Sequence, residues 1–392
     1  MKIAMFAWES LHSLAVGGVA VHVTELAAAL QRRGHELHVF ARLGQGQTPY
    51  AVIDGVHYHR CPIQLHPDFI TEMNNMCNSF VYFLGETEAY QCARFDIVHG
   101  HDWLCAKGVV QAKNDRGSRV VMTFHSSEYG RCGNHYYNGK AERIRGIEAE
   151  AAYCADRVIA VSGTLAEEVQ GQYNIPGWKL RTIYNGINCH RFDGYIDPAV
   201  CRRTYGIGPL DPLVLFVGRM TTQKGPDLLL EAVPSILKDR GDAKVVFVGD
   251  GELKGPLEGR AHQLGVSHAV RFPGAMGANG DLVNLFKSAD AVCVPSRNEP
   301  FGIIVLEAWA AGKPVIATRN GGPRELISHG RDGYLVYDHP GSIHWGIRET
   351  FANFDHARWM GQNGRVKAAY GFSWDTIAAH TEGVYREILG QA

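Results

Sequence analysis

Short apolar runs alternate with longer amphipathic stretches along the first half of the chain. The runs are rich in Val and Ile, and stretches with helical periodicity, such as 19–34, lie between them. Runs of this length predict strands that are buried on both faces, and the stretches between them predict the crossover helices of a parallel sheet. The predicted strands cover 2–7, 36–41, 95–100, 119–124, 157–162 and 180–185.

A turn-rich segment over 185–198 interrupts this pattern before a second series of strands begins. These strands are predicted at 213–218, 243–249, 269–274, 290–296, 313–318 and 333–338. We therefore predict an α/β protein with two Rossmann-like, doubly wound parallel-sheet domains that face an inter-domain cleft. The first domain covers 1–190 and the second covers 198–371, with a hinge between them. The final segment, 372–392, carries an amphipathic helical pattern, and we expect it to pack back on the first domain.

Composition and charge narrow the possible functions. The 392 residues carry 39 Lys and Arg against 40 Asp and Glu, a formal net charge of -1, so no global field would attract nucleic acid. No apolar run approaches the ~18 residues of a membrane span, and the first residues lack the pattern of a secretory leader. Nine cysteines are scattered without a C-x-x-C pair, which argues against a zinc site and favours a reduced, cytoplasmic protein.

Several common catalytic motifs are absent from the sequence. The histidines show no H-E-x-x-H spacing, and neither a P-loop nor a G-x-S-x-G motif occurs. The glycine-rich segment 249–255 has G-x-G-x-x-x-G spacing, which differs from a dinucleotide-binding loop, so we interpret it as a strand-to-helix turn. The sequence therefore predicts neither a metal hydrolase nor a serine hydrolase, and we expect no metal or other cofactor.

In the first domain, candidate functional residues follow predicted strands. Gly17 and Gly18 lie between the first strand and the first helix, where backbone N–H groups could hold an anion, although a plain turn explains them as well. His125 ends a strand and could hydrogen-bond substrate hydroxyls, or serve only as a turn residue. Ser126 and Tyr129 follow it as candidates for acceptor contacts.

Asp102 closes the preceding predicted strand, next to an aromatic residue. A carboxylate beside an aromatic face is a common way to hold a sugar, so Asp102 is a candidate on the sugar or acceptor side. The alternative is that Asp102 caps the helix that begins at Trp103.

Two cations follow the first strand of the second domain. Arg219 and Lys224 have four residues between them, at the carboxyl end of a strand and just before a helix. Two cations in this position could neutralise a diphosphate from two directions, because ligands of parallel sheets bind at the carboxyl ends of strands. A solvated loop with a surface ion pair is the alternative interpretation.

The densest group of candidates lies in 296–327. Glu299 and Glu307 are eight positions apart, and Phe301, Gly302 and Ile303 open a helix between them. Carboxylates suit the vicinal hydroxyls of a sugar or ribose, and the N–H groups at the helix start can meet negative charge. Glu307 stands inside an apolar stretch, where an unpaired carboxylate costs several kcal/mol, so a purely structural role is the weaker interpretation.

Together these motifs resemble those of the retaining, nucleotide-sugar-dependent glycosyltransferases of the GT-B fold, a family 4-like group that includes glycogen synthases and sucrose-phosphate synthases. The resemblance covers nearly the whole chain, and the segment from Glu299 to Glu307 is its most specific part. Val16 stands where the bacterial glycogen synthases carry a lysine before the paired glycines, so the acceptor remains open.

The resemblance implies a role for each of these motifs. Arg219 and Lys224 would hold the donor diphosphate, and Glu307 would bind the nucleotide ribose. Glu299 would contact the hydroxyls of the donor sugar.

The same resemblance extends to the backbone and to the first domain. The backbone of Phe301 and Gly302 would line the donor sugar, and Gly17 with Gly18 would approach the phosphates or the acceptor. His125 would hydrogen-bond the transferred sugar.

We therefore expect a retaining hexosyltransferase that moves a glucosyl or similar group from a UDP- or ADP-hexose to a hydroxyl acceptor. The acceptor would be a sugar, a sugar phosphate or a glucan. Two other classes remain open at this point: a sugar-nucleotide epimerase of the same fold, which would need no acceptor, and a non-catalytic nucleotide-sugar sensor.

Overall fold

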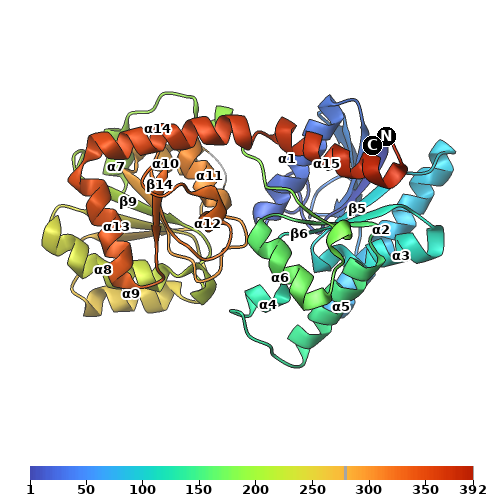
Figure 1. Ribbon diagram of the computed structural model, residues 1–392, viewed down its shortest axis with the longest axis horizontal. Coiled ribbons are helices and arrows are strands. Elements are labelled where there is room, and N and C mark those ends of the chain that lie inside the picture. The colour runs from blue at the N-terminus through green and yellow to red at the C-terminus, as the bar shows by residue number, and fades with distance from the viewer. Residues whose placement is uncertain (278–279, 392) are drawn as a thin grey trace. The chain divides into compact units, whose positions relative to one another are not determined.

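The computed structural model describes residues 1–277 and 280–391. The chain forms two compact units, one built from Met1–Gly186 together with the segment from Trp374 onward, and one built from Ile187–Ser373. We call them unit 1 and unit 2. In each unit helices cover both faces of a largely parallel sheet (Figure 1), so the predicted α/β fold with two doubly wound domains is confirmed.

Unit 1 contains an eight-stranded sheet with the strand order β3-β4-β2-β1-β5-β6-β7-β8. All neighbouring strands are parallel except β3, which runs antiparallel to β4. The strands are β1 (Lys2–Phe6), β2 (Glu36–Arg42), β3 (Tyr50–Ile53), β4 (Val56–Cys61), β5 (Ile97–His101), β6 (Val120–Phe124), β7 (Arg157–Ala160) and β8 (Leu180–Thr182).

Alternation along β1 shows how this sheet is buried on both faces. Ile3 and Met5 belong to a core with helices α1 (Gly18–Arg32) and α15 (Trp374–Leu389). Phe6 points to the other face, where its ring contacts Phe80 of α2 (Phe69–Gln91). The C-terminal helix α15 therefore lies beside α1 in unit 1 (Figure 1). The other helices of the unit are α3 (Ala106–Arg116), α4 (Glu128–Arg131), α5 (Lys140–Cys154) and α6 (Gly163–Tyr173).

Unit 2 contains a six-stranded, all-parallel sheet with the order β11-β10-β9-β12-β13-β14. This is the Rossmann order, in which the first strand lies in the middle and the chain moves first to one side and then to the other. The strands are β9 (Leu213–Val217), β10 (Lys244–Val248), β11 (Val270–Gly274), β12 (Ala291–Val294), β13 (Val315–Thr318) and β14 (Gly333–Val336).

The helices of unit 2 also pack on both faces of its sheet. Leu229 of α8 and Ile347 of α13 join alternate residues of the strands, such as Val245, in one core. Trp309 of α11 is fully buried, and α11 packs against α14. The helices are α7 (Pro198–Thr204), α8 (Pro226–Asp239), α9 (Lys254–Gln263), α10 (Gly280–Ser288), α11 (Ile303–Ala310), α12 (Pro323–Leu326), α13 (Pro340–Ala352) and α14 (Phe354–Gly371).

The strand order determines where loops gather in each unit. In unit 1 the order reverses between β1 and β5, and in unit 2 it reverses between β9 and β12. Neighbouring parallel strands that are followed by helices on opposite faces leave a crevice at their carboxyl ends, which is where open α/β sheets bind ligands. Most predicted site residues follow these strands, whereas His125, Ser126 and Tyr129 follow β6, the neighbour of β5.

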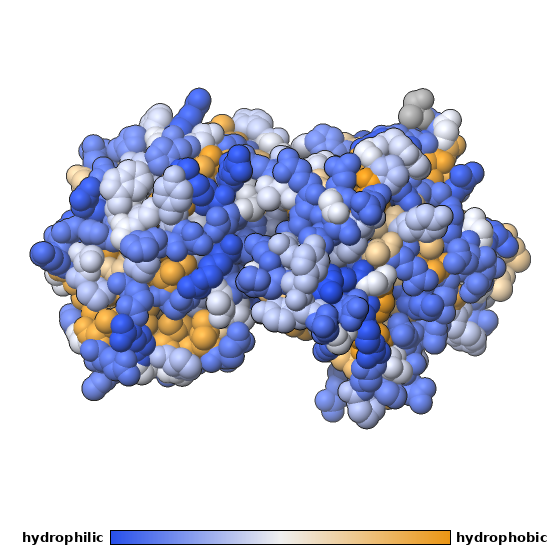
Figure 2. Space-filling model, turned by 60° about the horizontal axis from the view of Figure 1, so that its bottom comes forward, coloured by the Kyte–Doolittle hydropathy of each residue, from blue (hydrophilic) through white to orange (hydrophobic). Residues whose placement is uncertain are grey.

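The surface of the molecule is mostly polar in the view of Figure 2, where apolar residues gather in separate patches. Among the described residues, no helix has the length and apolar composition needed to cross a membrane.

Candidate functional site

In unit 2, the loops after β9 and β12 pack directly against each other. Gly225 has a φ of 65°, and a Cβ atom there would lie 2.2 Å from the carbonyl oxygen of Pro295, so only glycine fits. Arg297 adds a second link, because its guanidinium donates to both carboxylate oxygens of Asp227 and to the carbonyl of Thr222. The two loops that carry Lys224 and Glu299 are therefore held together by backbone contact and by an ion pair.

Lys224 and Glu299 meet in this crevice. The Nζ atom of Lys224 lies 2.9 and 2.8 Å from the two carboxylate oxygens of Glu299, and the Ser296 hydroxyl donates to one of those oxygens over 2.9 Å. The Glu299 side chain is nearly buried, and that of Lys224 is mostly buried. Two residues that lie 75 positions apart in sequence thus form one charge-paired unit.

The backbone of the Glu299 loop is supported by a pair of glycines after β13. Gly322 donates its N–H to the carbonyl of Glu299 over 2.8 Å. Gly321 has a φ of 81°, and a Cβ atom there would lie 2.1 Å from that carbonyl oxygen, while a Cβ atom on Gly322 would lie 2.2 Å from the carbonyl oxygen of Phe301. Ser296, Gly321 and Gly322 were not predicted as site residues, although the paired glycines were a visible signal in the sequence.

The start of α11 places the remaining candidates of this segment. Phe301 is buried, and Gly302 caps the helix with a φ of 101°. Ile303 is the first residue of the helix, so its N–H lies at the positive end of the helix dipole.

Glu307 lies one turn further along α11 and is partly buried. Burial among apolar groups raises the pKa of Glu307 to about 7, and the positive charge of Arg191 opposes this shift. Near neutral pH this carboxyl group is therefore present in both protonated and ionised forms. A poorly solvated carboxyl of this kind is typical of a functional site rather than of a structural helix.

Arg219 is exposed, and among the described residues no ion pair links it to a carboxylate. Its loop rests on the glycine-rich turn after β10, which the sequence analysis interpreted as a strand-to-helix turn. A Cβ atom on Gly249 would lie 1.9 Å from the carbonyl oxygen of Gly218, and Met220 donates its N–H to the carbonyl of Asp250. These glycines support the Arg219 loop.

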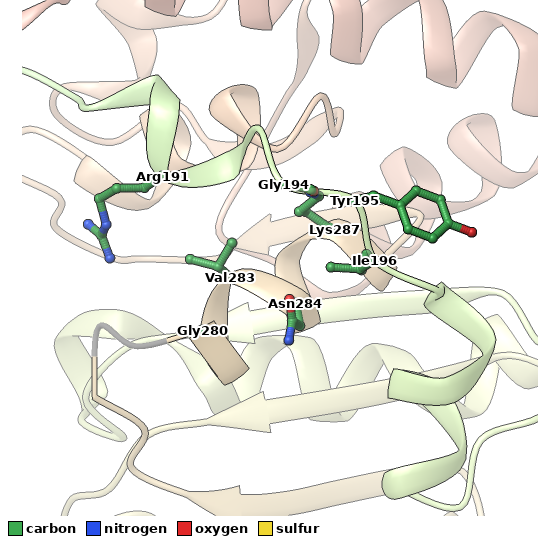
Figure 3. Close-up of a pocket in the computed structure, with 8 residues that line it drawn as sticks. All are labelled: Arg191, Gly194, Tyr195, Ile196, Gly280, Val283, Asn284 and Lys287. Atoms are coloured by element: carbon green, nitrogen blue, oxygen red, sulfur yellow. The ribbon is translucent and has the colours of Figure 1, made fainter.

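A pocket of about 280 Å³ lies beside α10 in unit 2 (Figure 3). None of the residues that line it was predicted as a site residue. Arg191 connects this pocket to the predicted site, because its charge acts on Glu307. The lining residues are Arg191, Gly194, Tyr195, Ile196, Gly280, Val283, Asn284 and Lys287.

In unit 1, a carboxylate of the protein already occupies the glycine loop after β1. Glu9 accepts hydrogen bonds from the N–H groups of Val16 and Gly17 over 2.6 and 2.8 Å, and it is 2% exposed. Burial raises the pKa of Glu9, and these backbone donors oppose that shift. The loop therefore binds an anionic group, as its N–H groups suggested, but the group is Glu9. Glu9 was not predicted as part of this loop, and its place eight positions before Gly17 was the available signal.

Gly17 itself is exposed and extended, with a φ of -152°. A Cβ atom at this position would meet only the Oε1 atom of Glu9, at an ordinary contact distance of 3.5 Å. The packing of unit 1 therefore does not require glycine at position 17. Gly18 is the first residue of α1.

Asp102 organises the loop after β6 and does not cap the helical turn at Trp103. It is 8% exposed, with a φ of 58°, and its Oδ1 atom accepts the N–H of His125 over 2.7 Å and that of Ser126 over 3.4 Å. No side-chain cap bond to the turn after β5 accompanies these contacts. Burial raises the pKa of Asp102, while the charge of Arg131 lowers it. Asp102 and His125 are thus in direct contact.

The imidazole of His125 is half-buried and lies among other histidines. Its Nε2 atom is 3.2 Å from Nδ1 of His101, and its ring packs edge-on against that of His22 at a centroid distance of 4.5 Å. Burial lowers the pKa of His125 to about 3, so the ring is neutral at pH 7. It can exchange hydrogen bonds with hydroxyl groups but does not contribute a charge.

The two remaining candidates lie further along the same loop. The Ser126 hydroxyl accepts a hydrogen bond from Arg131, which also pairs with Glu148, and the Tyr129 ring contacts Tyr136. Ser126 and Tyr129 are both partly exposed, and they lie one and four positions after His125. Among the described contacts, neither residue hydrogen-bonds to the side chain of His125.

Two family models match the chain. The model described as glycosyl transferases group 1 covers residues 202–367, and the model described as Glycosyltransferase Family 4 covers residues 16–191. The first model lies within unit 2, and the second covers most of unit 1 and ends at the start of unit 2.

Whole-chain comparisons agree with these models. An uncharacterized glycosyltransferase of Methanocaldococcus jannaschii is 38% identical over 100% of both chains, and a D-inositol 3-phosphate glycosyltransferase of Actinosynnema mirum is 31% identical over 92% of this chain and 89% of its own. The solved structure of a sucrose-phosphate synthase from Thermosynechococcus elongatus is 22% identical and superposes with a TM-score of 0.83 over 100% of both chains. The chain therefore belongs to the glycosyltransferases of the GT-B fold.

Proposed function

We propose that the protein is a retaining hexosyltransferase that takes a glucosyl or similar group from a UDP- or ADP-hexose and transfers it to a hydroxyl of a sugar, a sugar phosphate or a glucan. The observation that carries the proposal is the Lys224–Glu299 pair at the carboxyl ends of β9 and β12. A cation and a carboxylate held side by side match the diphosphate and the hydroxyl groups of one activated sugar.

In this proposal unit 2 binds the donor. Lys224 and Glu299 neutralise each other before the donor arrives. When the donor binds, its diphosphate contacts Lys224 and its sugar hydroxyls contact Glu299. Arg219 is exposed and free to reach the diphosphate. Glu307 accepts the ribose hydroxyls, and the N–H groups at the start of α11 face the phosphates or the sugar.

The leaving group needs charge stabilisation more than it needs a proton. Arg219, Lys224 and the α11 dipole supply positive charge to the diphosphate, so we propose that departure of the nucleoside diphosphate requires no metal ion. Activity should therefore persist in EDTA.

Unit 1 supplies the contacts to the transferred sugar and to the acceptor. The neutral imidazole of His125, whose backbone Asp102 holds, is suited to hydrogen bonds with sugar hydroxyls. Ser126 and Tyr129 lie next in sequence as acceptor contacts. The Actinosynnema relative is named for D-inositol 3-phosphate, which supports a phosphorylated compound as one of the proposed acceptors.

We propose a front-face displacement for the chemical step. The bond between the anomeric carbon and the phosphate oxygen breaks, and the acceptor oxygen forms its bond on the same face. The proton of the acceptor hydroxyl passes to the departing phosphate oxygen, so no protein nucleophile is needed.

Calorimetric titration with UDP, ADP and GDP tests the donor half of the proposal. Lys224→Ala and Glu307→Ala should each weaken binding of the preferred nucleotide by at least about tenfold, which corresponds to about 1.4 kcal/mol. Lys238→Ala and Glu258→Ala change exposed residues of the same types in the same unit, and they should bind like the wild type. Wild-type affinity in both site variants would exclude this donor site.

Product analysis tests the reaction itself. With the preferred nucleotide-glucose, we expect a new glycosidic product only when an acceptor is present, and NMR of that product should show the anomeric configuration of the donor. An epimerised donor without acceptor, or tight binding with no turnover across sugars, sugar phosphates and glucans, would contradict the transferase proposal.

A further inference from the structure

Three histidines from separate segments of unit 1 lie close together at the carboxyl ends of β5 and β6. They are His22 of α1, His101 at the end of β5 and His125 after β6. Each can direct one ring nitrogen into the group, and these three nitrogens lie within 4.8 Å of one another. His22 and His101 are 4% and 0% exposed, whereas His125 is half-buried, which leaves an approach for a small solute.

Two nitrogens of this group have no partner among the described residues. The Nε2 atoms of His22 and His101 are buried and form no hydrogen bond. A buried polar atom without a partner costs free energy, so native proteins usually supply one. A ligand that the polypeptide does not supply is therefore expected at the Nε2 atom of His22, whose Nδ1 atom already has a partner.

Asn185 prepares one of these histidines as a ligand. Its side-chain oxygen lies 2.7 Å from Nδ1 of His22, so that nitrogen carries the proton and the Nε2 atom carries the lone pair. Metal-binding histidines typically donate their second ring N–H to an oxygen in this way, which orients the ring and fixes its tautomer.

The spacing of the group also suits a metal ion. With Zn–N bonds of about 2.0–2.1 Å, two ligands of a tetrahedral ion lie about 3.3 Å apart. The Nδ1 atom of His101 and the Nε2 atom of His125 are 3.2 Å apart and share a hydrogen bond, which an ion bound by both nitrogens would replace. The widest of the three separations would need to close by no more than about 1.5 Å, a shift that rotation of the side chains can supply. The carboxyl group of Asp102, which follows His101 in sequence, is also buried at this edge of the sheet.

We propose that His22, His101 and His125 form a binding site for one divalent transition-metal ion such as Zn²⁺. The site lies within unit 1, and its geometry does not depend on the transferase function proposed above. The ion would link α1 to the ends of β5 and β6, and it would occupy a nitrogen of His125.

A second group of histidines in unit 1 provides an internal comparison. His38, His57 and His59 stack along β2 and β4, and each has at least one ring nitrogen that already has a hydrogen-bond partner. His38 bonds to His59 and to Glu36, and His57 bonds to the Tyr50 hydroxyl. We therefore expect this second group not to bind the ion.

The experiment titrates the untagged full-length protein with ZnCl₂ and with CoCl₂. We expect one ion per chain, intense visible absorption from a tetrahedral Co²⁺ complex, and Zn²⁺-dependent shifts of three imidazole signals in NMR spectra. His22→Phe should weaken binding by at least about tenfold, and Asn185→Ala should weaken it by about 10- to 100-fold. His57→Phe, which alters the second group, should bind like the wild type.

The NMR titration of the wild type keeps the test valid if a buried variant fails to fold. Absence of saturable one-to-one binding in the wild type would overturn the proposal. So would shifts confined to His38, His57 and His59, or undiminished binding by a folded His22→Phe protein. This experiment measures metal binding and not transfer. Transferase activity that persists in EDTA would therefore neither support nor contradict the metal site.

Discussion

A substitution at Gly17 can test for contact with a ligand without a large effect on folding. Its backbone is extended and its Cβ position is open, so Gly17→Ala should change the free energy of unfolding by no more than about 0.5 kcal/mol. If the donor or the acceptor approaches this backbone, the same change should raise the Kd or KM of that substrate at least about tenfold. Chemical denaturation and substrate titration measure the two effects.

Gly146→Ala is the matched control for this substitution. Gly146 is an exposed glycine of α5 with no atom near its Cβ position. Its replacement should leave substrate affinity unchanged. Normal affinity in Gly17→Ala as well would mean that neither substrate approaches Gly17.

Glu307 gives the protein a specific dependence of stability on pH. Its pKa is about 7 in the folded protein against 4.5 for an ordinary glutamate, so the folded state binds the proton more tightly than the unfolded state. The contribution of Glu307 is therefore most favourable below pH 4.5, and it declines as the pH rises toward 7, by up to roughly 3 kcal/mol. Above about pH 7, Glu307 should no longer change the free energy of unfolding as the pH rises.

Urea denaturation between pH 5 and 8 measures this slope. Glu307→Gln should remove the decline, because an amide does not titrate, while Glu258→Gln on an exposed position should retain it. An identical pH profile in Glu307→Gln and the wild type would show that Glu307 ionises normally.

At the residue scale, the sequence was informative where a side chain closes a strand. His125 and Asp102 were predicted to close strands, Lys224 was predicted at the carboxyl end of a strand, and Glu299 was predicted in the segment 296–327 before a helix. The structure pairs Lys224 with Glu299 and Asp102 with His125. The partner of the glycine loop was not predicted, because contact between Glu9 and Gly17 depends on how the intervening loop folds back.

At the scale of the elements, Gly321 connects the loop after β13 to the loop that carries Glu299. An alanine there would combine an unfavourable positive φ with a 2.1 Å contact to a backbone carbonyl that cannot move freely. We expect Gly321→Ala to destabilise the protein by about 1–2 kcal/mol from the backbone conformation, and by a further 1–3 kcal/mol from the contact. Transfer activity should fall with it, because the Glu299 backbone is displaced.

Gly330→Ala isolates the first of these two costs. Gly330 also has a positive φ, 76°, but no atom lies near its Cβ position. Denaturation should show only the smaller loss for this variant, and activity should be retained. Equal losses for the two variants would mean that the contact at Gly321 is unimportant.

The elements themselves were largely predictable, and the exceptions have a physical reason. All twelve predicted strands occur, since buried parallel strands read as continuous apolar runs. The hairpin of β3 and β4 was not predicted, because its strands alternate polar and apolar residues at a sheet edge. Its turn, Asp54-Gly55, has positive φ at both positions and was the available signal.

At the scale of the whole molecule, α15 completes the core of unit 1 from the far end of the sequence. The Tyr385 hydroxyl of α15 lies 2.7 Å from Nδ1 of His99 in β5, and both residues are fully buried or nearly so. Tyr385→Phe should lower the free energy of unfolding by about 1–3 kcal/mol, because it leaves a buried ring nitrogen without a partner. Thermal or chemical denaturation measures this loss.

Tyr370→Phe in α14 provides the comparison, since Tyr370 is 82% exposed. Removal of its hydroxyl should leave stability unchanged within about 0.5 kcal/mol. A loss for Tyr385→Phe no larger than that for Tyr370→Phe would show that the bond to His99 contributes nothing.

The periodic pattern of the sequence predicted two sheets, one after the other along the chain. It did not predict that three histidines of unit 1 lie together. His22, His101 and His125 are far apart in sequence and follow no ligand spacing, so only the pairing of β1, β5 and β6 could bring them together. Long-range contact of this kind depends on strand order, which local patterns do not encode.

The return of the chain to unit 1 constrains how the protein is made. The first 186 residues leave the ribosome long before Trp374, Ile377 and Tyr385, which cover one face of the first sheet. During synthesis the part of this apolar face that α15 covers, beside α1, must remain uncovered until the whole of unit 2 has been translated. The nascent chain is therefore most exposed to aggregation in that interval, and a premature stop before α15 would release a first unit that lacks part of its core.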